Sequence, residues 1–345
     1  MRPTLLADSV RLTEDAVEIL DRRIFPFEIT YVRCLTVDEV AKAIFDMVTQ
    51  SGGPFLAASA GLVLAARELD RGDLPREEQH RELHAAADRL IATRPTNNQI
   101  RTVLGEMLQV IDTCGDDEAL ADVTERAMEA AWMRRERRAR ELGVVGAQVI
   151  SPDDVVLTHC WGEQAVMEPL IAAKEAGTDF RVICTETRPY LQGSRLTAHS
   201  VAELGVDVEV ITDGMAAALM ARGAIDVVIT AADRVTIDGY VVNKIGTFQI
   251  ALAAHALGVP YYCMTTRPDV SARGPDAVPI EERDGDEVLY ALGHRVASPL
   301  VRGRYPAFDV TPPDLVTGIG TSKGLFSPAD LEGVDWSDPP RTGSD

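Results

Sequence analysis

The N-terminal part of the chain has the hydrophobic pattern of amphipathic helices. From about residue 35 to about residue 140, apolar positions recur at helical spacing and charged positions separate them. The stretch TVDEVAKAIFDMVTQ offers Thr36 as an N-cap, with Glu39 three positions later as in a capping box. The stretch DEALADVTERAMEAAWMRRERRARELG carries acidic residues early and basic residues late, which suits the helix dipole. We therefore predict a mainly helical N-terminal domain over residues 1–142 that ends in a long connecting helix.

After Gly143 the pattern changes to short, β-branched runs. These alternate with helical segments such as AVMEPLIAAKEAG and FQIALAAHALG. Alternation of this kind predicts a parallel sheet with right-handed crossovers, so we expect an α/β protein with its catalytic sheet in residues 143–330. The runs are DVVLTHC, FRVICTET, DVEVIT, VVIT and PYYCMTT. The polar, Pro- and Gly-rich segment 331–345 predicts a disordered tail.

Composition narrows the class of protein without choosing an activity. The chain has 345 residues, 46% of them hydrophobic, which predicts a globular protein of two domains or one large α/β unit. Its 54 acidic and 34 basic side chains give a formal net charge of −20. Nucleic-acid binding needs a basic surface, so we expect no nucleic-acid partner, and we interpret the short run RRERRAR as a solvated helix end. A small anion needs only a local cluster of basic groups and is not excluded.

The cysteines and histidines bear on location and cofactors. Five cysteines without a CxxC pair predict free thiols in a reducing cytoplasm. The N-terminus lacks the apolar core of a signal peptide, and no stretch approaches the roughly 20 apolar residues of a membrane helix, so we expect no membrane partner. Six scattered histidines predict no metal site. No GxGxxG follows a predicted strand, so we expect no dinucleotide and no other cofactor.

Polar side chains follow several of the predicted strands. Ligands of parallel sheets bind outside the carboxyl ends of the strands, so these side chains predict a site along one rim. The set contains a thiol, carboxylates, a lysine, two arginines and two carboxamides: Cys160, Glu186, Arg188, Gln192, Asp233, Arg234, Asn243 and Lys244. The segment NKIGT (243–247) resembles a phosphate grip, with a lysine followed by a glycine at a helix start.

Cys160 and Asp233 are the members of this set with the clearest chemistry. A helix N-terminus after Cys160 lowers the pKa of a thiol and favours a reactive thiolate, whereas a cysteine inside a strand is usually inert core. Burial of Asp233 would raise the pKa of its carboxyl and equip it as a general acid. The alternative for Asp233 is a salt bridge to Arg188 or Arg234. We interpret His159 as structural, since adjacent strand residues face opposite ways.

Four stretches closely resemble the methylthioribose-1-phosphate isomerase family: TETRPYLQGSRLTA, AADRVTIDGYVVNKIGTFQIALAAHALGVPYY, PIEERDGDEV and YPAFDVTPPDLVTGIGTSKG. Ribose-1,5-bisphosphate isomerases, deoxyribose-1-phosphate isomerases and regulatory subunits of initiation factor 2B are relatives of this family. The resemblance covers roughly residues 17–328. It implies a helical N-terminal domain, a Rossmann-like C-terminal domain and a homodimer. It also implies cofactor-independent conversion of an aldose 1-phosphate, a small sugar phosphate, to the ketose 1-phosphate.

The same resemblance implies roles for individual residues. Asp233 matches a catalytic acid for ring opening, and Cys160 matches a cysteine that assists hydrogen transfer from C2 to C1. The hydrogen moves either as a proton through an enol phosphate or as a hydride in a site that excludes water. Arg94, Gln192, Asn243 and Lys244 match the family's substrate and phosphate contacts, and we expect Gly52 and Trp161 to be substrate-binding residues as well.

Two segments depart from the family pattern. Ser51-Gly52-Gly53-Pro54 stands where the family usually reads Arg-Gly-Ala-Pro, so a phosphate-binding arginine is missing. Trp161-Gly162-Glu163 stands where the family usually has Asn, a small residue and Gly. Three interpretations are open: an isomerase of methylthioribose 1-phosphate or a related 5-substituted or deoxy ribose 1-phosphate, a non-catalytic metabolite-sensing homologue, or an isomerase of another ribose-like substrate in specialised metabolism.

Overall fold

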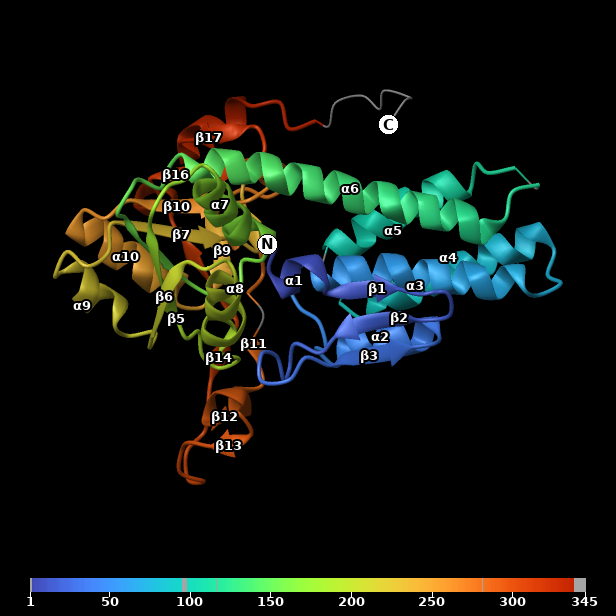
Figure 1. Cartoon of the computed structure of the whole chain (residues 1–345), viewed down its shortest axis with the longest axis horizontal. Helices are drawn as coiled ribbons and strands as arrows, with labels where there is room; N and C mark the ends of the chain where they lie inside the picture. Colours follow the sequence, from blue (N-terminus) through green and yellow to red (C-terminus); the bar gives the residue numbers. More distant parts are fainter. Residues whose placement is uncertain (1, 95–97, 116, 281, 338–345) are drawn as a thin grey trace. The chain divides into compact units, whose positions relative to one another are not determined.

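The computed structural model describes residues 2–94, 98–115, 117–280 and 282–337. The chain forms two compact units that divide between Arg137 and Arg138, inside the long helix α6 (Leu120–Ala147) (Figure 1). Most of the stretch predicted as a long helix lies within α6. The domain limits at residues 142 and 330 stay predictions of the sequence.

The first unit combines helices with a small sheet that the sequence analysis did not predict. Its helices are α1 (Thr4–Ala7), α2 (Val37–Phe45), α3 (Gly53–Asp70), α4 (Arg76–Ala92) and α5 (Asn98–Ile111). Its antiparallel strands are β1 (Val10–Leu12), β2 (Val17–Leu20) and β3 (Tyr31–Cys34). Strands of three or four residues are too short for their alternation to register in the sequence. The N-cap predicted at Thr36 is confirmed, because its side chain accepts a hydrogen bond from the Glu39 amide at 3.2 Å.

The second unit is built on a seven-stranded sheet with the order β17-β16-β10-β7-β4-β5-β6. All neighbouring strands are parallel except the β16–β17 pair. This arrangement confirms the predicted fold class, an α/β protein whose C-terminal part is a parallel, Rossmann-like sheet. The strands are β4 (Val155–Thr158), β5 (Arg181–Thr185), β6 (Asp207–Ile211), β7 (Val227–Ala231), β10 (Tyr261–Met264), β16 (Gly318–Thr321) and β17 (Gly324–Phe326).

Helices connect the parallel strands and bury both faces of the sheet. They are α7 (Gln164–Glu175), α8 (Ala198–Glu203), α9 (Ala216–Met220) and α10 (Thr247–Leu257). Figure 1 shows α9 and α10 on one side of the sheet and α7 and α8 on the other. On the first side, Met220 and Ile250 pack in one apolar cluster with Leu157 and Val228 of the central strands. Strands buried on both faces read as continuous apolar runs, which is why the sequence revealed them.

A second, smaller sheet and an arm complete this unit. The small sheet has the order β15-β9-β8 and consists of β8 (Arg234–Val235), β9 (Val241–Lys244) and β15 (Phe308–Thr311). The arm contains β11 (Glu282–Arg283), β12 (Tyr290–Ala291), β13 (His294–Arg295) and β14 (Tyr305–Pro306), and its β12–β13 hairpin projects away from the large sheet (Figure 1). Short helical turns are η1 (Gly193–Thr197), η2 (Pro275–Ala277), η3 (Gly285–Leu289), η4 (Pro313–Leu315) and η5 (Pro328–Gly333).

The prediction of a disordered tail is wrong for residues 331–337. Leu331 is fully buried, and Trp336 is 8% exposed and donates its indole N–H to the Leu331 carbonyl at 2.8 Å. The Trp336 ring also packs edge-to-face against Phe326, with centroids 5.7 Å apart. Two large apolar side chains give this polar-looking segment enough buried surface to order it. Residues 338–345 lie outside the described residues.

Candidate active site

Cys160 lies two residues beyond the end of β4, on a backbone turn that places it at the rim of the sheet. Its φ is +67°, in the left-handed region that non-glycine residues rarely adopt. Two threonines fix this turn. The Cys160 amide donates to Thr187 Oγ1 at 2.9 Å, and Thr197 Oγ1 donates to the Cys160 carbonyl at 2.6 Å. The cysteine is thus held by the segment that follows β5, which supports its predicted position at the strand exit.

The histidine before Cys160 is a structural residue, as its sequence position suggested. His159 is 1% exposed, and its Nε2 lies 2.9 Å from the carbonyl oxygen of Ile245. Its Nδ1 lies 2.6 Å from Thr185 Oγ1. Burial lowers the pKa of His159, so the ring is neutral near pH 7, with Nε2–H donating and Nδ1 accepting. The side chain joins the ends of β4, β5 and β9 and has no nitrogen left to act on Cys160.

The Cys160 thiol does not have the low pKa that a helix N-terminus would give it. Burial raises its pKa, the positive charge of Lys244 and a backbone hydrogen bond from Trp161 lower it, and the carboxylates of Asp213 and Asp233 raise it. Helix α7 begins only at Gln164, four residues after the cysteine. The expectation of a thiolate stabilised by the helix is therefore wrong, and Lys244 is the positive group that favours the thiolate.

Asp233 follows β7, the strand that pairs in parallel with β4. Its side chain is exposed at the rim, so burial does not prepare it as an acid. The salt bridge to Arg188 or Arg234 considered for it stays a prediction, and the structure shows other contacts of these two arginines. Arg234 lies 3.5 Å from Asp269, and Arg188 donates to the carbonyls of Val288 and Tyr290.

The loop after Cys160 packs against the end of β7. A Cβ on Gly162 would come within 2.9 Å of the Ala231 Cβ and 2.3 Å of Val166, so only glycine fits there. This packing brings the Cys160 turn close to the strand that carries Asp233. The two site residues predicted to be catalytic therefore leave neighbouring strands at the same edge of the sheet.

Asn243 and Lys244 lie on β9 and are both buried. The Asn243 amide donates to Thr247 Oγ1 at 3.0 Å. The Lys244 ammonium donates to the Tyr305 hydroxyl at 3.3 Å and lies 4.7 Å from the centre of the Phe308 ring. Aromatic ring faces attract an ammonium group, and a positive charge in a buried site acts more strongly on nearby anions than it does in water.

Backbone amides at the start of α10 donate to a side chain of the protein itself. Both oxygens of Asp309 accept hydrogen bonds from this helix start, from the Gly246 amide at 2.7 Å and from the Phe248 amide at 3.1 Å. Burial raises the pKa of Asp309 to about 6, against the effect of these bonds and of Lys244. A carboxylate of the protein itself thus takes an anion position at this helix start, and phosphate binding by the segment 243–247 stays a prediction that rests on Asn243 and Lys244.

Gln192 lies in the connection after β5, next to a π-helical turn. It is 5% exposed, and the turn η1 begins at Gly193, where a Cβ would lie 1.8 Å from the Thr185 carbonyl oxygen. The backbone is also strained at Thr187 (φ +61°) and Leu191 (φ +60°). Strained backbone and π-helical turns are concentrated at functional sites in proteins, and the strain here borders the Cys160 turn.

Trp161 and Glu163, the two bulky departures from the family pattern, are buried rather than on the surface. Trp161 is 5% exposed, and within the described residues its indole N–H has no hydrogen-bond partner. Glu163 is 4% exposed and has φ +46° and ψ −130°, a conformation that glycine adopts most easily. Holding a glutamate in this backbone conformation costs free energy. Its presence therefore changes the local structure next to Cys160.

Gly52 and Arg94 belong to the first unit. Gly52 is buried and caps the start of α3, and it follows Ser51, whose φ is +57°. The Arg94 guanidinium contacts the sulfur of Met47, another residue with positive φ. Their contacts with substrate stay predictions.

Comparison with known proteins decides the family. Residues 50–328 match the Initiation factor 2 subunit family. The chain belongs to this family. A methylthioribose-1-phosphate isomerase from Thermotoga neapolitana is 38% identical over 343 residues, which is 96% of this chain and 98% of the relative. The resemblance found in the sequence motifs is thereby confirmed.

Two solved structures of the Initiation factor 2 subunit family have this fold. The crystal structure of 5-methylthioribose 1-phosphate isomerase from Pyrococcus horikoshii is 29% identical, with a TM-score of 0.85 over 96% of this chain and 97% of that one. The crystal structure of the translation initiation factor eIF-2B subunit delta from A. fulgidus is 32% identical, with a TM-score of 0.84 over 93% and 96%. The family fold is therefore shared by a metabolic enzyme and a translation factor.

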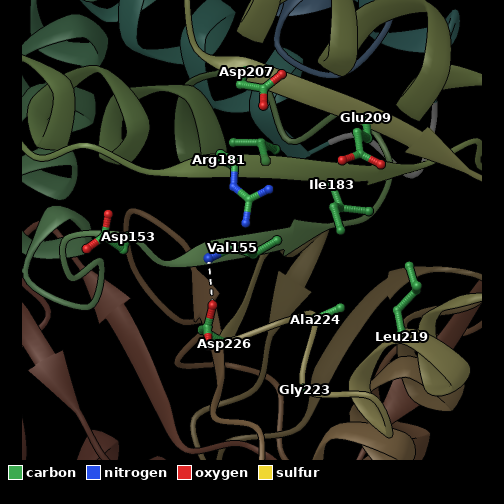
Figure 2. A pocket seen from close by; sticks show the side chains of 11 residues that line it. Asp153, Val155, Arg181, Ile183, Asp207, Glu209, Leu219, Gly223, Ala224 and Asp226 are labelled. Atoms are coloured by element: carbon green, nitrogen blue, oxygen red, sulfur yellow. Dashed lines mark hydrogen bonds between the residues drawn. The ribbon is translucent and has the colours of Figure 1, made fainter.

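A cavity of about 240 Å³ lies elsewhere in the second unit. Its lining includes the first residues of three parallel strands, Val155, Arg181 and Asp207, so it lies at the end of the sheet opposite to Cys160. Figure 2 shows the Arg181 guanidinium between Asp207 and Asp226, with Asp226 accepting a hydrogen bond from the Val155 amide at 2.8 Å. None of the site residues predicted from the sequence lines this cavity.

Two negative findings concern the described residues only. Within the ranges that the structure describes, no group of three His, Cys, Asp or Glu side chains is arranged to hold a metal ion. In the same ranges, no helix is long and apolar enough to cross a membrane.

Sequence reasoning missed several residues that shape this rim. Asp213 follows β6 and accepts hydrogen bonds from the amides of Thr187 at 2.8 Å and Arg188 at 2.7 Å. Its place just after a predicted strand is the signal that could have found it, since the other polar residues of the rim stand after strands in the same way. No local signal marks Tyr305, because it reaches Lys244 from a segment 61 positions away.

Proposed function

We propose that the chain is a cofactor-independent aldose–ketose isomerase that converts a ribose-type sugar 1-phosphate to the ketose 1-phosphate. An intramolecular oxidoreductase of this kind is the enzyme class of the curated relatives named methylthioribose-1-phosphate isomerase. The observation that carries the proposal is that Cys160 and Asp233 leave adjacent parallel strands at one edge of the sheet. The buried charge of Lys244 beside them supports it.

The first chemical step is ring opening. A phosphate on C1 blocks the ordinary hemiacetal route, so the ring oxygen has to receive a proton as its bond to C1 breaks. We assign this step to Asp233, which follows β7 at the rim. A bound substrate that covers this exposed carboxyl would remove it from water and favour the protonated form that acts as the acid. Lys244 and the carboxamides of Gln192 and Asn243 are the proposed partners of the phosphate and hydroxyl groups, together with Gly52, Arg94 and Trp161.

The second step moves one hydrogen from C2 to C1. In one route the Cys160 thiolate takes the C2 proton, an enol phosphate forms, and a proton returns to C1 as the C2 hydroxyl becomes a ketone. In the other route C2 passes a hydride directly to C1 in a site that excludes water. Turnover in deuterium oxide separates them, since the first route allows solvent deuterium at C1 and the second does not.

The test of the proposal is a turnover panel of ribose 1-phosphates with methylthio, deoxy, 5-phosphorylated and plain substituents. We expect turnover of at least one compound and a loss of about 10²-fold or more in Cys160→Ser and in Asp233→Asn. Cys114→Ser, which alters a cysteine of the first unit, is the matched control and should keep full activity. Full activity in Cys160→Ser would remove the thiol from the mechanism.

A second candidate is a non-catalytic, metabolite-sensing homologue. The identity to the eIF-2B delta structure, 32%, is as high as that to the isomerase structure, 29%. Ser51 in place of an arginine, and the buried Trp161 and Glu163, also favour a changed role or a changed ribose-like substrate. Binding of a sugar phosphate without turnover across the panel supports the sensor, whereas turnover of one unusual substituent supports an enzyme of specialised metabolism.

A further inference from the structure

The ammonium group of Lys244 is held in place by aromatic side chains. The Tyr305 hydroxyl accepts a hydrogen bond from Nζ at 3.3 Å, and Nζ lies 4.7 Å from the ring centre of Phe308 and 5.6 Å from that of Tyr305. Phe308 is the direct partner of Lys244 across the antiparallel β9–β15 pair. Ring faces attract a cation and the hydroxyl gives it a direction, so these two side chains together fix where the charge points.

Tyr305 is itself fixed from the other side. It is 2% exposed, and its ring meets that of Tyr190 edge-to-face with centroids 6.1 Å apart. The Tyr190 hydroxyl contacts Arg283, which is the strand partner of Tyr305 in the β11–β14 pair. Burial raises the pKa of Tyr305, so its hydroxyl is neutral and keeps its lone pairs for the ammonium. The position of this hydroxyl is therefore determined by the arm.

Lys244 and Cys160 belong to segments that contact each other. His159, the residue before Cys160, has its Nε2 2.9 Å from the carbonyl oxygen of Ile245, the residue after Lys244. The groups that act on the thiol electrostatically are Lys244 on β9, Asp213 after β6, Asp233 after β7 and Tyr305 on β14. Of these four, Lys244 alone favours the thiolate, and the two carboxylates oppose it. A backbone hydrogen bond from Trp161 also lowers the pKa of the thiol. A small displacement of the Lys244 ammonium therefore changes the fraction of Cys160 that is thiolate.

We infer that Tyr305 is a positioning residue, whose hydroxyl directs the Lys244 ammonium toward the Cys160 thiol. This inference deepens the proposed isomerase function and rests on it for the use that the reaction makes of the thiol. The reactivity of the thiol, however, is measurable without any substrate. A failed isomerase assay and a failed positioning test are therefore distinguishable.

The test is the rate of Cys160 alkylation by iodoacetamide as a function of pH, followed on the Cys160 peptide by mass spectrometry. The thiolate is the reacting form, so at a pH below the midpoint the rate reports the thiolate fraction. We expect Cys160 in Tyr305→Phe to react at about one third of the wild-type rate or more slowly, and the pH midpoint of alkylation to rise. In Lys244→Met the midpoint should rise further. Tyr290→Phe is the matched control and should keep the wild-type rate, because its exposed hydroxyl accepts from Arg295 and contacts neither Lys244 nor Tyr305.

Two further variants keep the inference falsifiable. In the double variant Lys244→Met/Tyr305→Phe, the loss of the Tyr305 hydroxyl should add nothing to the effect of Lys244→Met. If Tyr305→Phe fails to fold, Phe308→Leu takes its place. It removes the second ring and should also raise the midpoint. An unchanged or lowered midpoint in folded Tyr305→Phe overturns the inference. So does an effect of Tyr305→Phe that persists without Lys244, since the hydroxyl would then act on the thiol by another route.

Discussion

At the scale of single residues, Asp309 is an acidic side chain placed where the fold penalises its charge. It caps the start of α10 through the Gly246 and Phe248 amides, yet burial raises its pKa to about 6 from an ordinary value of 3.8. A carboxyl whose pKa is raised on folding stabilises the protein when protonated. This contribution is complete below the unfolded pKa and is lost as the pH rises through the folded one.

We predict that the stability of Asp309→Asn increases relative to that of the wild type as the pH rises from 4 to 7. The asparagine oxygen still accepts a backbone bond but carries no charge, so the difference in free energy of unfolding should shift by up to about 3 kcal/mol. Urea unfolding of both proteins at several pH values measures it. Asp314→Asn, at an exposed position five residues along, should show no such trend. A wild-type-to-variant difference that is constant with pH would contradict the prediction.

At the scale of elements, the connection between β5 and α8 holds the Cys160 turn. Thr187 and Thr197 bind the amide and the carbonyl of Cys160, and Asp213 binds the Thr187 amide. The connection reaches this shape because Gly193 brings the π-helical turn against the Thr185 carbonyl. A well-packed connection of this kind transmits any change at the glycine to the cysteine.

We predict that Gly193→Ala lowers stability by roughly 2 kcal/mol or more, since its Cβ would lie 1.8 Å from the Thr185 carbonyl oxygen and backbone would have to move. Gly214→Ala is the control, because a Cβ there meets nothing within 4 Å. Thermal unfolding measures stability, and the rate of Cys160 alkylation reports on the turn. Equal melting temperatures for the two variants would show that the connection is not as tightly packed as described.

At the scale of the whole molecule, the family resemblance implies a homodimer. The second unit leaves several large apolar side chains in contact with water, among them Leu252, Leu257 and Leu300, the last 93% exposed. Burying such exposed apolar side chains against a second subunit would remove them from water, which favours association.

We predict that light scattering gives a mass of about twice the 37.4 kDa of one chain, near 75 kDa. The mass should hold over a dilution series down to micromolar concentrations. A mass of one chain throughout the series would reject the homodimer.

The sequence by itself determined the α/β class, the central strands and the family. Strands buried on both faces are long apolar runs, and the motifs around Cys160, Asp233 and Lys244 are contiguous, so both are visible without a fold. The short strands β1–β3 were missed because three or four residues carry too little alternation. The ordered segment 331–337 was missed because its two buried anchors, Leu331 and Trp336, stand among polar residues.

The electrostatics of the site was decided by the tertiary structure alone. The pKa of Cys160 depends on burial and on Lys244, 84 positions away in the chain, and not on the helix that comes after the cysteine. The start of α10 looks like an anion site in sequence, yet Asp309 from another strand occupies it. The local sequence pattern located these residues. Their charge states depend on electrostatic fields and hydrogen bonds from residues distant in the sequence, so only the tertiary structure determines them.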